Sequence, residues 1–380
     1  MALRILLAGG GTGGHVYPLV AVAEELKKQA AQSNKSIELR MMGDGDLIRQ
    51  VAGELGIPFS RVPSSKWRRY FSVWNFVDAI KFPFGFLLAL IKVWLFMPDA
   101  IFSKGGHGGF LPALAGRLLF IPIIIHDSDA VPGRANRFLG KFAKRVCVNF
   151  ESAVAYFPVG KTEVTGEPLR SAVLQKYDKA QALATFGFSS EGGSASGGDP
   201  SRPTVFITGA GQGSQIINDT IMAGLVELMK QYQVIHQCGP KHFDSMTKRL
   251  EQVEKEEPAV AEMIRKSYKL FAVLTAEQMA QAYSASDVVV SRSGSGIFEI
   301  AATSKPVIVI PLASAANNHQ LINAQEFAKF GATVITEDNL KPHLLLYEIG
   351  QVYAHRDEIA SKISQFARPD AANTIAGLLL

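Results

Sequence analysis

A histidine and two aspartates in the first half of the chain could move a proton. His15 directly follows the glycines Gly9–Gly14, and Asp127 and Asp129 follow the apolar run Ile121–Ile125. Because an imidazole titrates near neutral pH, His15 could contact a hydroxyl group or a diphosphate, with a capping or packing role as an equal alternative. The aspartates could accept hydrogen bonds or act as general bases. All three follow predicted strands, where open α/β sheets bind ligands.

The spacing of these carboxylates could also hold a divalent metal. Asp127 with Asp129, and Asp44 with Asp46, both have the D-x-D spacing, which is common by chance. For Asp44 and Asp46 a polar turn is the favoured interpretation, and for Asp127 and Asp129 a hydrogen-bonding or general-base role. The chain has two cysteines, too few for a Cys-based zinc site. A metal site is therefore the less favoured interpretation of these carboxylates.

The glycines before His15 match the pattern G-x-G-x-x-G. Glycine lets a backbone approach a ligand closely, and the following helix offers N–H groups to an anion. This pattern also occurs in nicotinamide or flavin dinucleotide sites, where Asp44 or Asp46 would hold the ribose. The histidine after the last glycine, and a second glycine loop at Gly209–Gly213, favour a sugar nucleotide instead.

Short apolar runs alternate with helical sequence, in the order of a doubly wound parallel sheet. The first half predicts strands at Arg4–Ala8, Ile37–Met42, Ala100–Ser103 and Ile121–His126. After the Gly/Ser-rich segment Ser189–Pro203 the plan restarts, with strands at Thr204–Thr208, Val234–Gln237, Asp287–Ser291 and Val307–Pro311. We predict an α/β fold of two similar domains facing each other, residues 1–168 and 169–364, with the junction near Gly166–Arg170.

Composition excludes several classes of protein. Of 380 residues, 47% are hydrophobic and 19% charged, which excludes a disordered chain. The apolar stretch Phe82–Met97 is shorter than the roughly 20 residues of a membrane-spanning helix and is interrupted by Lys92. No secretory signal is recognisable before the first strand. We expect a soluble protein with one unusually apolar segment.

That segment, residues 61–98, mixes basic and aromatic side chains. Its spacing predicts two short helices flanking Pro83, with Leu87, Ile91 and Leu95 packed on the sheet. Several aromatic side chains lie off this stripe, including Phe96, and a membrane surface would bury them. The predicted membrane-associating residues are Trp67, Arg68, Arg69, Trp74, Phe86 and Trp94. A helix pair inside the core or a dimer contact is the alternative, and nucleic acid is disfavoured by the bulky aliphatic side chains.

Six blocks of sequence occur in a recognisable order along nearly the whole chain. They are GGGTGGHVYPLVAVAEEL, KGGHGGFLPALAG, HDSDAVPGRANRFLGKFAKRV, TGEPLR, TGAGQGSQIIN, and SRSGSGIFEIAATSKPVIVIP followed by HQLINA. Together they resemble the MurG family of lipid-linked peptidoglycan N-acetylglucosaminyltransferases. The resemblance implies the GT-B fold, two Rossmann-like domains facing across a cleft. It also implies that a last helix, within residues 365–380, packs back on the first domain.

The resemblance implies an enzyme that transfers N-acetylglucosamine from UDP-N-acetylglucosamine, with inversion and without a metal or other cofactor. The acceptor would be the C4 hydroxyl of the muramyl sugar in undecaprenyl-pyrophosphoryl-N-acetylmuramoyl-pentapeptide, lipid I, and the product lipid II. The first domain would take the acceptor at an anionic membrane surface, and the second would bind the UDP-sugar. The protein would be peripheral on the cytoplasmic face of the cell membrane, where it could meet other cell-wall synthesis proteins.

The resemblance also assigns expected roles to residues of this chain. Thr12, Gly13, Gly14 and Asp129 would contact the donor or lie at the reacting centre, and Arg170 would face the diphosphate. In the second domain Glu299 would bind ribose hydroxyls. The other expected donor contacts are Gly211, Leu274 near uracil, the helix start formed by Ser295, Gly296, Ile297 and Phe298, and Gln320 toward the sugar hydroxyls.

The chain departs from the family pattern in four places. The family usually has Asn at the position of Asp129, Glu at that of Asp127, and Ser at that of Gly211, and Ser293–Glu299 is one residue shorter. The catalytic base stays open among His15, Asp127 and Asp129. The alternatives are another GT-B enzyme with a different lipid acceptor, such as diacylglycerol or another polyprenyl lipid, and a non-catalytic sugar-nucleotide-binding protein.

Overall fold

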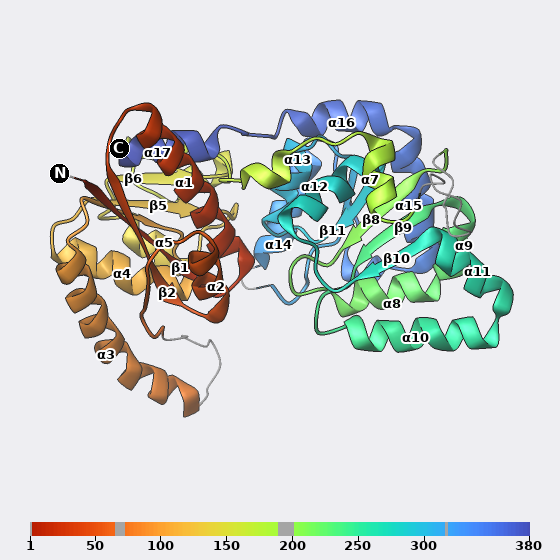
Figure 1. Ribbon diagram of the computed structural model, residues 1–380, viewed down its shortest axis with the longest axis horizontal. Helices are drawn as coiled ribbons and strands as arrows, with labels where there is room; N and C mark the ends of the chain where they lie inside the picture. The colour runs from red at the N-terminus through yellow and green to blue at the C-terminus, as the bar shows by residue number, and fades with distance from the viewer. Residues whose placement is uncertain (1, 65–72, 189–200, 316–317) are drawn as a thin grey trace. The chain divides into compact units, whose positions relative to one another are not determined.

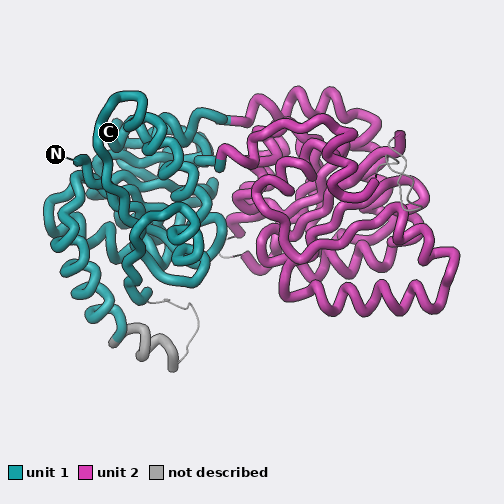
Figure 2. Tube along the Cα trace, viewed as in Figure 1, with its two compact units in different colours: residues 1–170, 368–380 teal, residues 171–367 magenta. Residues whose placement is uncertain are grey.

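The computed structural model describes residues 2–64, 73–188, 201–315 and 318–380, with the backbone alone over residues 73–80. The chain divides into two compact units, which Figure 2 colours separately. Unit 1 comprises residues 1–170 and 368–380, and unit 2 comprises residues 171–367. The first division therefore falls after Arg170, where the sequence analysis expects residue 168.

Unit 1 is built on a parallel sheet with the strand order β3-β2-β1-β4-β5-β6-β7. The strands are β1 (Leu3–Gly10), β2 (Ile37–Asp44), β3 (Phe59–Arg61), β4 (Ala100–Ser103), β5 (Ile123–Asp127), β6 (Arg145–Val148) and β7 (Thr162–Val164). The winding reverses between β1 and β4, which pair with Leu6 opposite Ile101. Ligands bind beside such a reversal, at the carboxyl ends of the strands, so the loops after β1, β4 and β5 carry the candidate site.

Helices cover both faces of this sheet (Figure 1). They are α1 (Gly13–Gln32), α2 (Asp46–Glu54), α3 (Val73–Phe96), α4 (Gly106–Leu118), α5 (Arg134–Leu139), α6 (Glu151–Val154) and α17 (Ala371–Leu379). Because side chains alternate along a strand, Ile5 and Leu7 pack in the core beneath α1 and α17, and Leu6 and Ala8 pack in the core beneath α3 and α4. Helix α17 is the last of the chain, and it packs on α1, where Gln29 Nε2 donates to Asn373 Oδ1 at 2.6 Å.

Unit 2 repeats the same topology, with the strand order β10-β9-β8-β11-β12-β13. Its strands are β8 (Thr204–Thr208), β9 (Gln233–Gln237), β10 (Tyr268–Phe271), β11 (Val288–Ser291), β12 (Val307–Val309) and β13 (Thr333–Val334). Its α-helices are α7 (Lys179–Thr185), α8 (Gln215–Ala223), α9 (Leu225–Gln231), α10 (Phe243–Glu256), α11 (Pro258–Ser267), α12 (Ala276–Ala285), α13 (Gly296–Ala302), α14 (His319–Ala328), α15 (Pro342–Ala354) and α16 (Arg356–Ser364). The prediction of two doubly wound parallel α/β domains is confirmed.

The prediction of two short helices flanking Pro83 is wrong, because Val73–Phe96 form one helix, α3. Pro83 removes one backbone donor, but the small residues after it allow close packing. Gly85 lies so near the Pro63 carbonyl that a Cβ atom would come within 2.7 Å of that oxygen. Gly85 and Ala89 are buried on this face, and the helix continues through Pro83.

The predicted packing stripe of α3 is also wrong. Leu87, Ile91 and Leu95 are exposed, whereas the buried side chains are Ala89, Val93 and Phe96. Two small residues on this face, Gly85 and Ala89, let α3 approach its neighbours, and α3 makes extensive contact with α4. Periodicity alone shows two apolar stripes here and does not reveal which one packs against the sheet.

Candidate functional site

Close glycine contacts build the loop edge of the unit 1 sheet. A Cβ atom on Gly43 would lie 1.7 Å from the carbonyl oxygen of Gly9, and one on Gly108 would lie 2.3 Å from the same atom. Only glycine fits at such distances. The start of α4 therefore packs directly against the end of β1, and the loops after β1 and β4 are brought together.

His15 lies in the first turn of α1, and its partly buried ring packs on this glycine contact. A Cβ atom on Gly106, the first residue of α4, would come within 2.2 Å of the His15 Cδ2 atom. Burial and, after it, the positive charge of Lys104 lower the pKa of His15 to about 4, against the opposing charges of Asp129 and Glu167. The imidazole is therefore neutral at pH 7 and can accept a proton.

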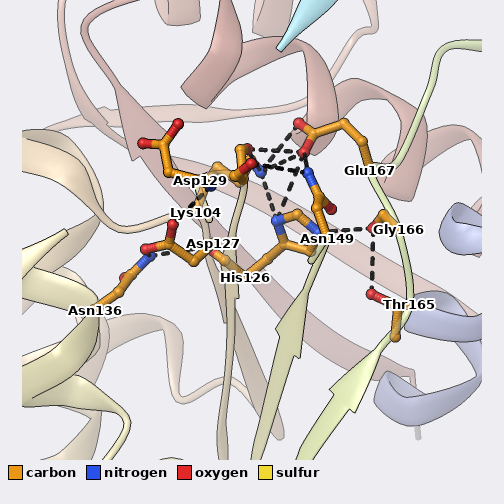
Figure 3. Close-up of polar contacts among 10 residues, drawn as sticks. Lys104, His126, Asp127, Asp129, Asn136, Asn149, Thr165, Gly166 and Glu167 are labelled. Carbon is orange, nitrogen blue, oxygen red and sulfur yellow. Dashed lines mark hydrogen bonds and ion pairs between the residues drawn. The ribbon is translucent and has the colours of Figure 1, made fainter. Parts of the chain in front are cut away.

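A cluster of buried polar side chains joins the ends of four neighbouring strands (Figure 3). Lys104 follows β4, and its Nζ atom forms an ion pair with Glu167 Oε1 at 3.0 Å and contacts Ser128 Oγ and His126 Nδ1. Glu167, which follows β7, also accepts from Ser128 Oγ at 2.8 Å and from Asn149 Nδ2 at 2.6 Å. We call Lys104, His126, Ser128, Asn149 and Glu167 the Lys104 cluster.

The hydrogen bonds of the Lys104 cluster define its protonation states. His126 Nε2 donates to the Gly166 carbonyl oxygen at 2.8 Å, and its Nδ1 accepts from Lys104. Burial and the charge of Lys104 lower the pKa of His126 to about 3, so this ring is neutral. Burial opposes ionisation of Glu167, but the charge of Lys104 and the surrounding donors hold its pKa below the ordinary value. The cluster thus contains one buried cation and one buried anion.

Asp127 is fixed by hydrogen bonds. Its Oδ1 accepts from the Asp129 N–H at 3.0 Å, and its Oδ2 accepts from the Gly133 N–H at 3.1 Å and from Asn136 Nδ2 at 2.9 Å. Burial and the neighbouring charge of Asp129 raise the pKa of Asp127 to about 6. These contacts hold the turn after β5 and so set the position of the partly buried Asp129.

Arg170 ends the first stretch of unit 1 close to the glycine loop. Its guanidinium carbon lies 3.9 Å from the centre of the Tyr17 ring, in a cation–π arrangement. The Tyr17 ring in turn packs on Gly13, where a Cβ atom would come within 2.8 Å of Cε2. Tyr17 therefore places Arg170 beside the loop that carries Thr12, Gly13 and Gly14.

The equivalent edge of unit 2 carries the second glycine loop, Gly209–Gly213. Ser214 Oγ accepts from the N–H of Ile217 at 3.4 Å, which caps α8. Arg292, which follows β11, donates to the same Ser214 oxygen at 2.6 Å and forms an ion pair with Glu337 at 2.7 Å. The buried arginine thereby fixes the end of the loop against the sheet.

The expected ribose ligand Glu299 lies in the first turn of α13 and is partly buried. Its Oε2 atom accepts a hydrogen bond from the Tyr283 hydroxyl at 3.1 Å. At the start of the same helix, the N–H of Ile297 donates to the Gly294 oxygen and that of Phe298 to the Ser295 oxygen.

Two other residues expected to contact the donor, Leu274 and Gln320, take part in hydrogen bonds between a backbone N–H and an amide side chain. The Leu274 side chain is only 5% exposed, and its N–H donates to Gln237 Oε1 at 3.1 Å. Gln237 also donates to the Ala210 carbonyl oxygen at 3.3 Å, which links the glycine loop to the Leu274 loop. Gln320 Oε1 accepts from the N–H of Leu312 at 3.0 Å. Gly211 has open space where a Cβ atom would stand.

The predicted membrane residues divide into three groups. Trp67, Arg68 and Arg69 lie outside the described residues, as does the side chain of Trp74. Phe86 is partly buried and packs against the core beneath α3, so it is not wholly directed outward. Trp94 is 59% exposed. Among the helices of the described residues, none combines the length and the apolar character needed to cross a membrane.

Sequence reasoning missed Lys104, Glu167, Asn149, Tyr17 and Arg292. The contacts that matter here, such as Lys104 with Glu167 and Tyr17 with Arg170, join residues far apart in sequence, so spacing gave no signal. The one available hint was the position of Lys104, which directly follows the predicted strand Ala100–Ser103 and precedes a run of glycines. Within the described ranges, no group of three or more His, Cys, Asp or Glu side chains could hold a metal ion.

Comparison with known proteins identifies the family. The glycosyltransferase family 28 N-terminal domain matches residues 5–148, and the C-terminal domain of the same family matches residues 204–375. The UDP-N-acetylglucosamine–N-acetylmuramyl-(pentapeptide) pyrophosphoryl-undecaprenol N-acetylglucosamine transferase of Legionella pneumophila strain Paris is 32% identical, covering 100% of this chain and 97% of that protein. The transferase of the same name from Lachnospira eligens is 31% identical, covering 99% and 98%.

Solved structures agree on the fold. MurG of Acinetobacter baumannii has a TM-score of 0.69 and 23% identity, with 100% of this chain and 99% of that chain covered. A UDP-GlcNAc 2-epimerase from Neisseria meningitidis, solved with UDP-GlcNAc, has a TM-score of 0.66 and 14% identity, with the same coverage. Both likenesses concern the two-domain α/β architecture, which is that of the GT-B glycosyltransferases. With full-length relatives above 30% identity, the chain belongs to the MurG family of glycosyltransferase family 28, and it is an N-acetylglucosamine transferase.

Proposed function

We propose that this protein transfers N-acetylglucosamine from UDP-N-acetylglucosamine to the C4 hydroxyl of the muramyl sugar of lipid I, giving lipid II. The observation that carries this proposal is the match, over the whole chain, to relatives named for that reaction. The acceptor binds to unit 1 and the UDP-sugar to unit 2. In a single displacement, the acceptor oxygen forms a bond to the anomeric carbon while the bond from that carbon to the UDP oxygen breaks. The configuration inverts, and UDP leaves with the electron pair.

His15 is the proposed acceptor of the proton from the hydroxyl. Its ring is neutral at pH 7, and it lies where the loops after β1 and β4 meet. Binding of a substrate that carries a diphosphate would add negative charge and make the ring a stronger base. Asp127 is a poorer candidate because three donors already occupy its carboxylate. Asp129, whose charge already favours protonation of His15, would stabilise the imidazolium that forms.

Four other residues at the unit 1 edge, Thr12, Gly13, Gly14 and Arg170, would bind the phosphate oxygens of a substrate. Thr12, Gly13 and Gly14 begin α1, where backbone N–H groups can bind an anion. Arg170, placed by Tyr17, would add a guanidinium that can bind two oxygens at once.

Unit 2 would bind the donor through hydrogen bonds. Glu299 would accept from the ribose hydroxyls while it keeps its bond from Tyr283. Because the N–H groups of Ile297 and Phe298 donate within α13, contacts to the leaving UDP would fall to Ser295 and Gly296. The other contacts would come from Gly211, from the Leu274 backbone beside the uracil, and from Gln320 near the sugar hydroxyls.

The exposed face of α3 would rest on the membrane that carries the acceptor. Phe84, Leu87, Ile91, Trp94 and Leu95 recur at helical spacing, and all are exposed. Aromatic side chains settle at the headgroup level of a bilayer, and basic side chains meet its anionic lipids. We place the protein on the cytoplasmic face of the membrane, where UDP-sugars are available, with other cell-wall synthesis proteins as further partners.

Co-sedimentation with vesicles containing anionic lipid tests this surface. The variant Trp94→Ser/Leu95→Ser should lose most of the binding. Tyr347→Ser is the matched control, because Tyr347 is a similarly exposed aromatic residue, 60% exposed, on α15 of unit 2. Equal binding by both variants and the unchanged protein would rule out this face.

A donor-by-acceptor activity matrix tests the reaction itself. Donors would be UDP-N-acetylglucosamine and UDP-glucose, and acceptors would be a lipid I analogue and diacylglycerol. We expect turnover with UDP-N-acetylglucosamine and the lipid I analogue well above every other pair. Turnover with diacylglycerol alone would replace the proposed acceptor, and absence of turnover with all pairs would contradict a transferase role.

A further inference from the structure

A buried ion pair beside His15 is not explained by substrate binding. The side chains of Lys104 and Glu167 are only 1% and 2% exposed, so neither can reach a substrate. Desolvation makes a buried pair costly, and apolar residues of similar size often give equal or greater stability. The pair therefore calls for a role other than stability.

Contacts from four strand ends fix the pair in place. Lys104 Nζ is held by Glu167, Ser128 Oγ and His126 Nδ1. Glu167 is held in turn by Ser128 Oγ and by Asn149 Nδ2, which also donates to the Ser128 carbonyl oxygen at 3.3 Å. Because neither charge can swing away, the electric field of the pair at its neighbours is fixed.

His15 is the neighbour that experiences this field. Its ring packs on Gly106, two residues after Lys104 in the chain. The titratable groups facing it are Lys104 and His107 from the β4–α4 connection, Asp129 after β5 and Glu167 after β7. Lys104 and His107 oppose a charge on the imidazole, whereas Asp129 and Glu167 favour it.

We infer that the Lys104–Glu167 pair is a positioning element for His15, which sets the charge of its ring and so keeps it available as a proton acceptor. This inference rests on the proposed function for its link to turnover, but not for its effect on the ring. A cation fixed beside a neutral imidazole raises the cost of the imidazolium. Glu167 limits that cost and keeps the ammonium in position. Removal of either charge should move the titration of His15, in opposite directions.

Titration of the His15 Cε1–H resonance by NMR in the full chain tests the inference, with His15→Gln assigning the signal. In the unchanged protein the resonance should not move between pH 5 and 8. In Lys104→Met the titration midpoint should rise by roughly one pH unit or more and enter that range. Lys104→Arg keeps the charge and should restore the flat response, which a merely structural role would not require.

Lys104→Met/Glu167→Gln serves if the single variant does not fold, because it leaves no unpaired buried charge. Its midpoint should also rise, but less, since the lysine affects His15 more than Glu167 does. Glu167→Gln alone should leave the resonance flat above pH 5. A response in Lys104→Met and in the double variant identical to that of the unchanged protein would overturn the inference.

The pH dependence of kcat separates this inference from the proposed function. If His15 is the base, the acid limb of kcat should move with the NMR midpoint in each variant. If the midpoint moves and the acid limb stays, the influence of the pair on His15 stands and the assignment of His15 as base fails. A lower kcat at every pH, with no movement of either quantity, would assign the pair a structural role only.

Discussion

The two units share one topology but differ in the side chains at their functional edges. Among the described buried residues, unit 1 carries Lys104, Asp127 and Glu167 as charged groups, all at strand ends beside the glycine loop. Unit 2 carries one, Arg292, and otherwise presents the neutral His236 and amides and hydroxyls such as Gln237 and Ser293. The same fold thus places titratable groups on one edge and mostly neutral hydrogen-bonding groups on the other.

This difference indicates a division of labour. Proton transfer requires groups whose protonation is tuned by burial and neighbouring charge, and the unit 1 edge has them. Recognition of ribose, base and sugar hydroxyls requires fixed donors and acceptors, which amides and backbone groups supply. In unit 1 the position after the glycine loop is His15, and in unit 2 it is Ser214, a hydroxyl that accepts from the N–H of Ile217 at 3.4 Å.

The largest expected effect concerns the buried charge of unit 1. Lys104→Met leaves Glu167 buried without its cation, so the free energy of unfolding should fall by about 3–5 kcal/mol. Lys104→Met/Glu167→Gln should recover most of this loss. In unit 2, Arg292→Met should cost less, because the Glu337 side chain is 15% exposed and the Glu167 side chain 2%. Urea unfolding at pH 7 measures all three, and equal losses at the two sites would remove the distinction between the edges.

Acid should change the stability of unit 1 through two groups, His126 and Asp127, whose pKa values are shifted in opposite directions. The pKa of His126 is lowered to about 3 in the folded chain, so between about pH 3 and 6.5 the unfolded chain binds more protons and stability falls as pH falls. The pKa of Asp127 is raised to about 6, so between about pH 4 and 6 it works in the opposite direction. Each effect has a limiting slope of about 1.4 kcal/mol per pH unit.

Urea unfolding at pH 7, 6 and 5 measures these slopes. His126→Gln should flatten the loss of stability toward acid, and Asp127→Asn should steepen it. In unit 2, His236 also has its pKa lowered to about 3 by burial, so His236→Gln should flatten the loss as well. Changes of the same sign for His126→Gln and Asp127→Asn would contradict the assigned protonation states.

A smaller effect is expected where Tyr17 places Arg170. Tyr17→Leu removes a cation–π contact worth about 0.5–2 kcal/mol, so kcat/KM should fall about 2- to 30-fold. Tyr17→Phe retains the aromatic face and is the control, with a change below about twofold. Steady-state kinetics with varied donor measures both, and equal losses in the two variants would show that the hydroxyl group matters rather than the stack.

The smallest effect is expected in the unit 2 glycine loop. Gly211→Ser adds a hydroxyl in open space and should strengthen UDP binding by about two- to tenfold, the gain from one hydrogen bond. Gly213→Ser adds the same hydroxyl in the same loop and is the control, which should not strengthen binding. Its φ is +78°, and a Cβ atom there would lie 2.0 Å from the Cys238 carbonyl oxygen. Titration calorimetry with UDP measures both. Unchanged binding by Gly211→Ser would place the diphosphate elsewhere.

Local sequence patterns were sufficient to predict the fold class, although strands β3, β6, β7, β10 and β13 were not predicted. Apolar runs ending at glycines predicted β1 and β8 with their loops, because a strand followed by a close backbone approach needs those residue types. The face of α3 could not be predicted, because Leu87 and Val93 mark two apolar stripes and the choice depends on how closely α4 approaches. Tertiary packing buries the stripe that contains Ala89, Val93 and Phe96.

The candidate site was predicted only in part. His15, Asp127 and Asp129 follow strands directly, and the parallel topology brings such positions to one edge. Lys104 and Glu167 were not predicted as site residues. Their importance comes from the ion pair that they form with each other, and they are separated by 63 positions in sequence. A charged residue next to a glycine motif is usually exposed, and only the three-dimensional structure reveals that this one is buried and paired.

The most direct test of the division of labour is to measure donor binding and transfer in the same variant, His15→Gln. Calorimetry with UDP-N-acetylglucosamine should give a Kd unchanged within about threefold, because the proposed contacts to uracil, ribose and the sugar hydroxyls belong to unit 2. Transfer of labelled N-acetylglucosamine to a lipid I analogue should fall about 10²- to 10⁴-fold, the usual contribution of a general base. Full transfer by this variant, or a loss of donor binding as large as the loss of transfer, would contradict the account.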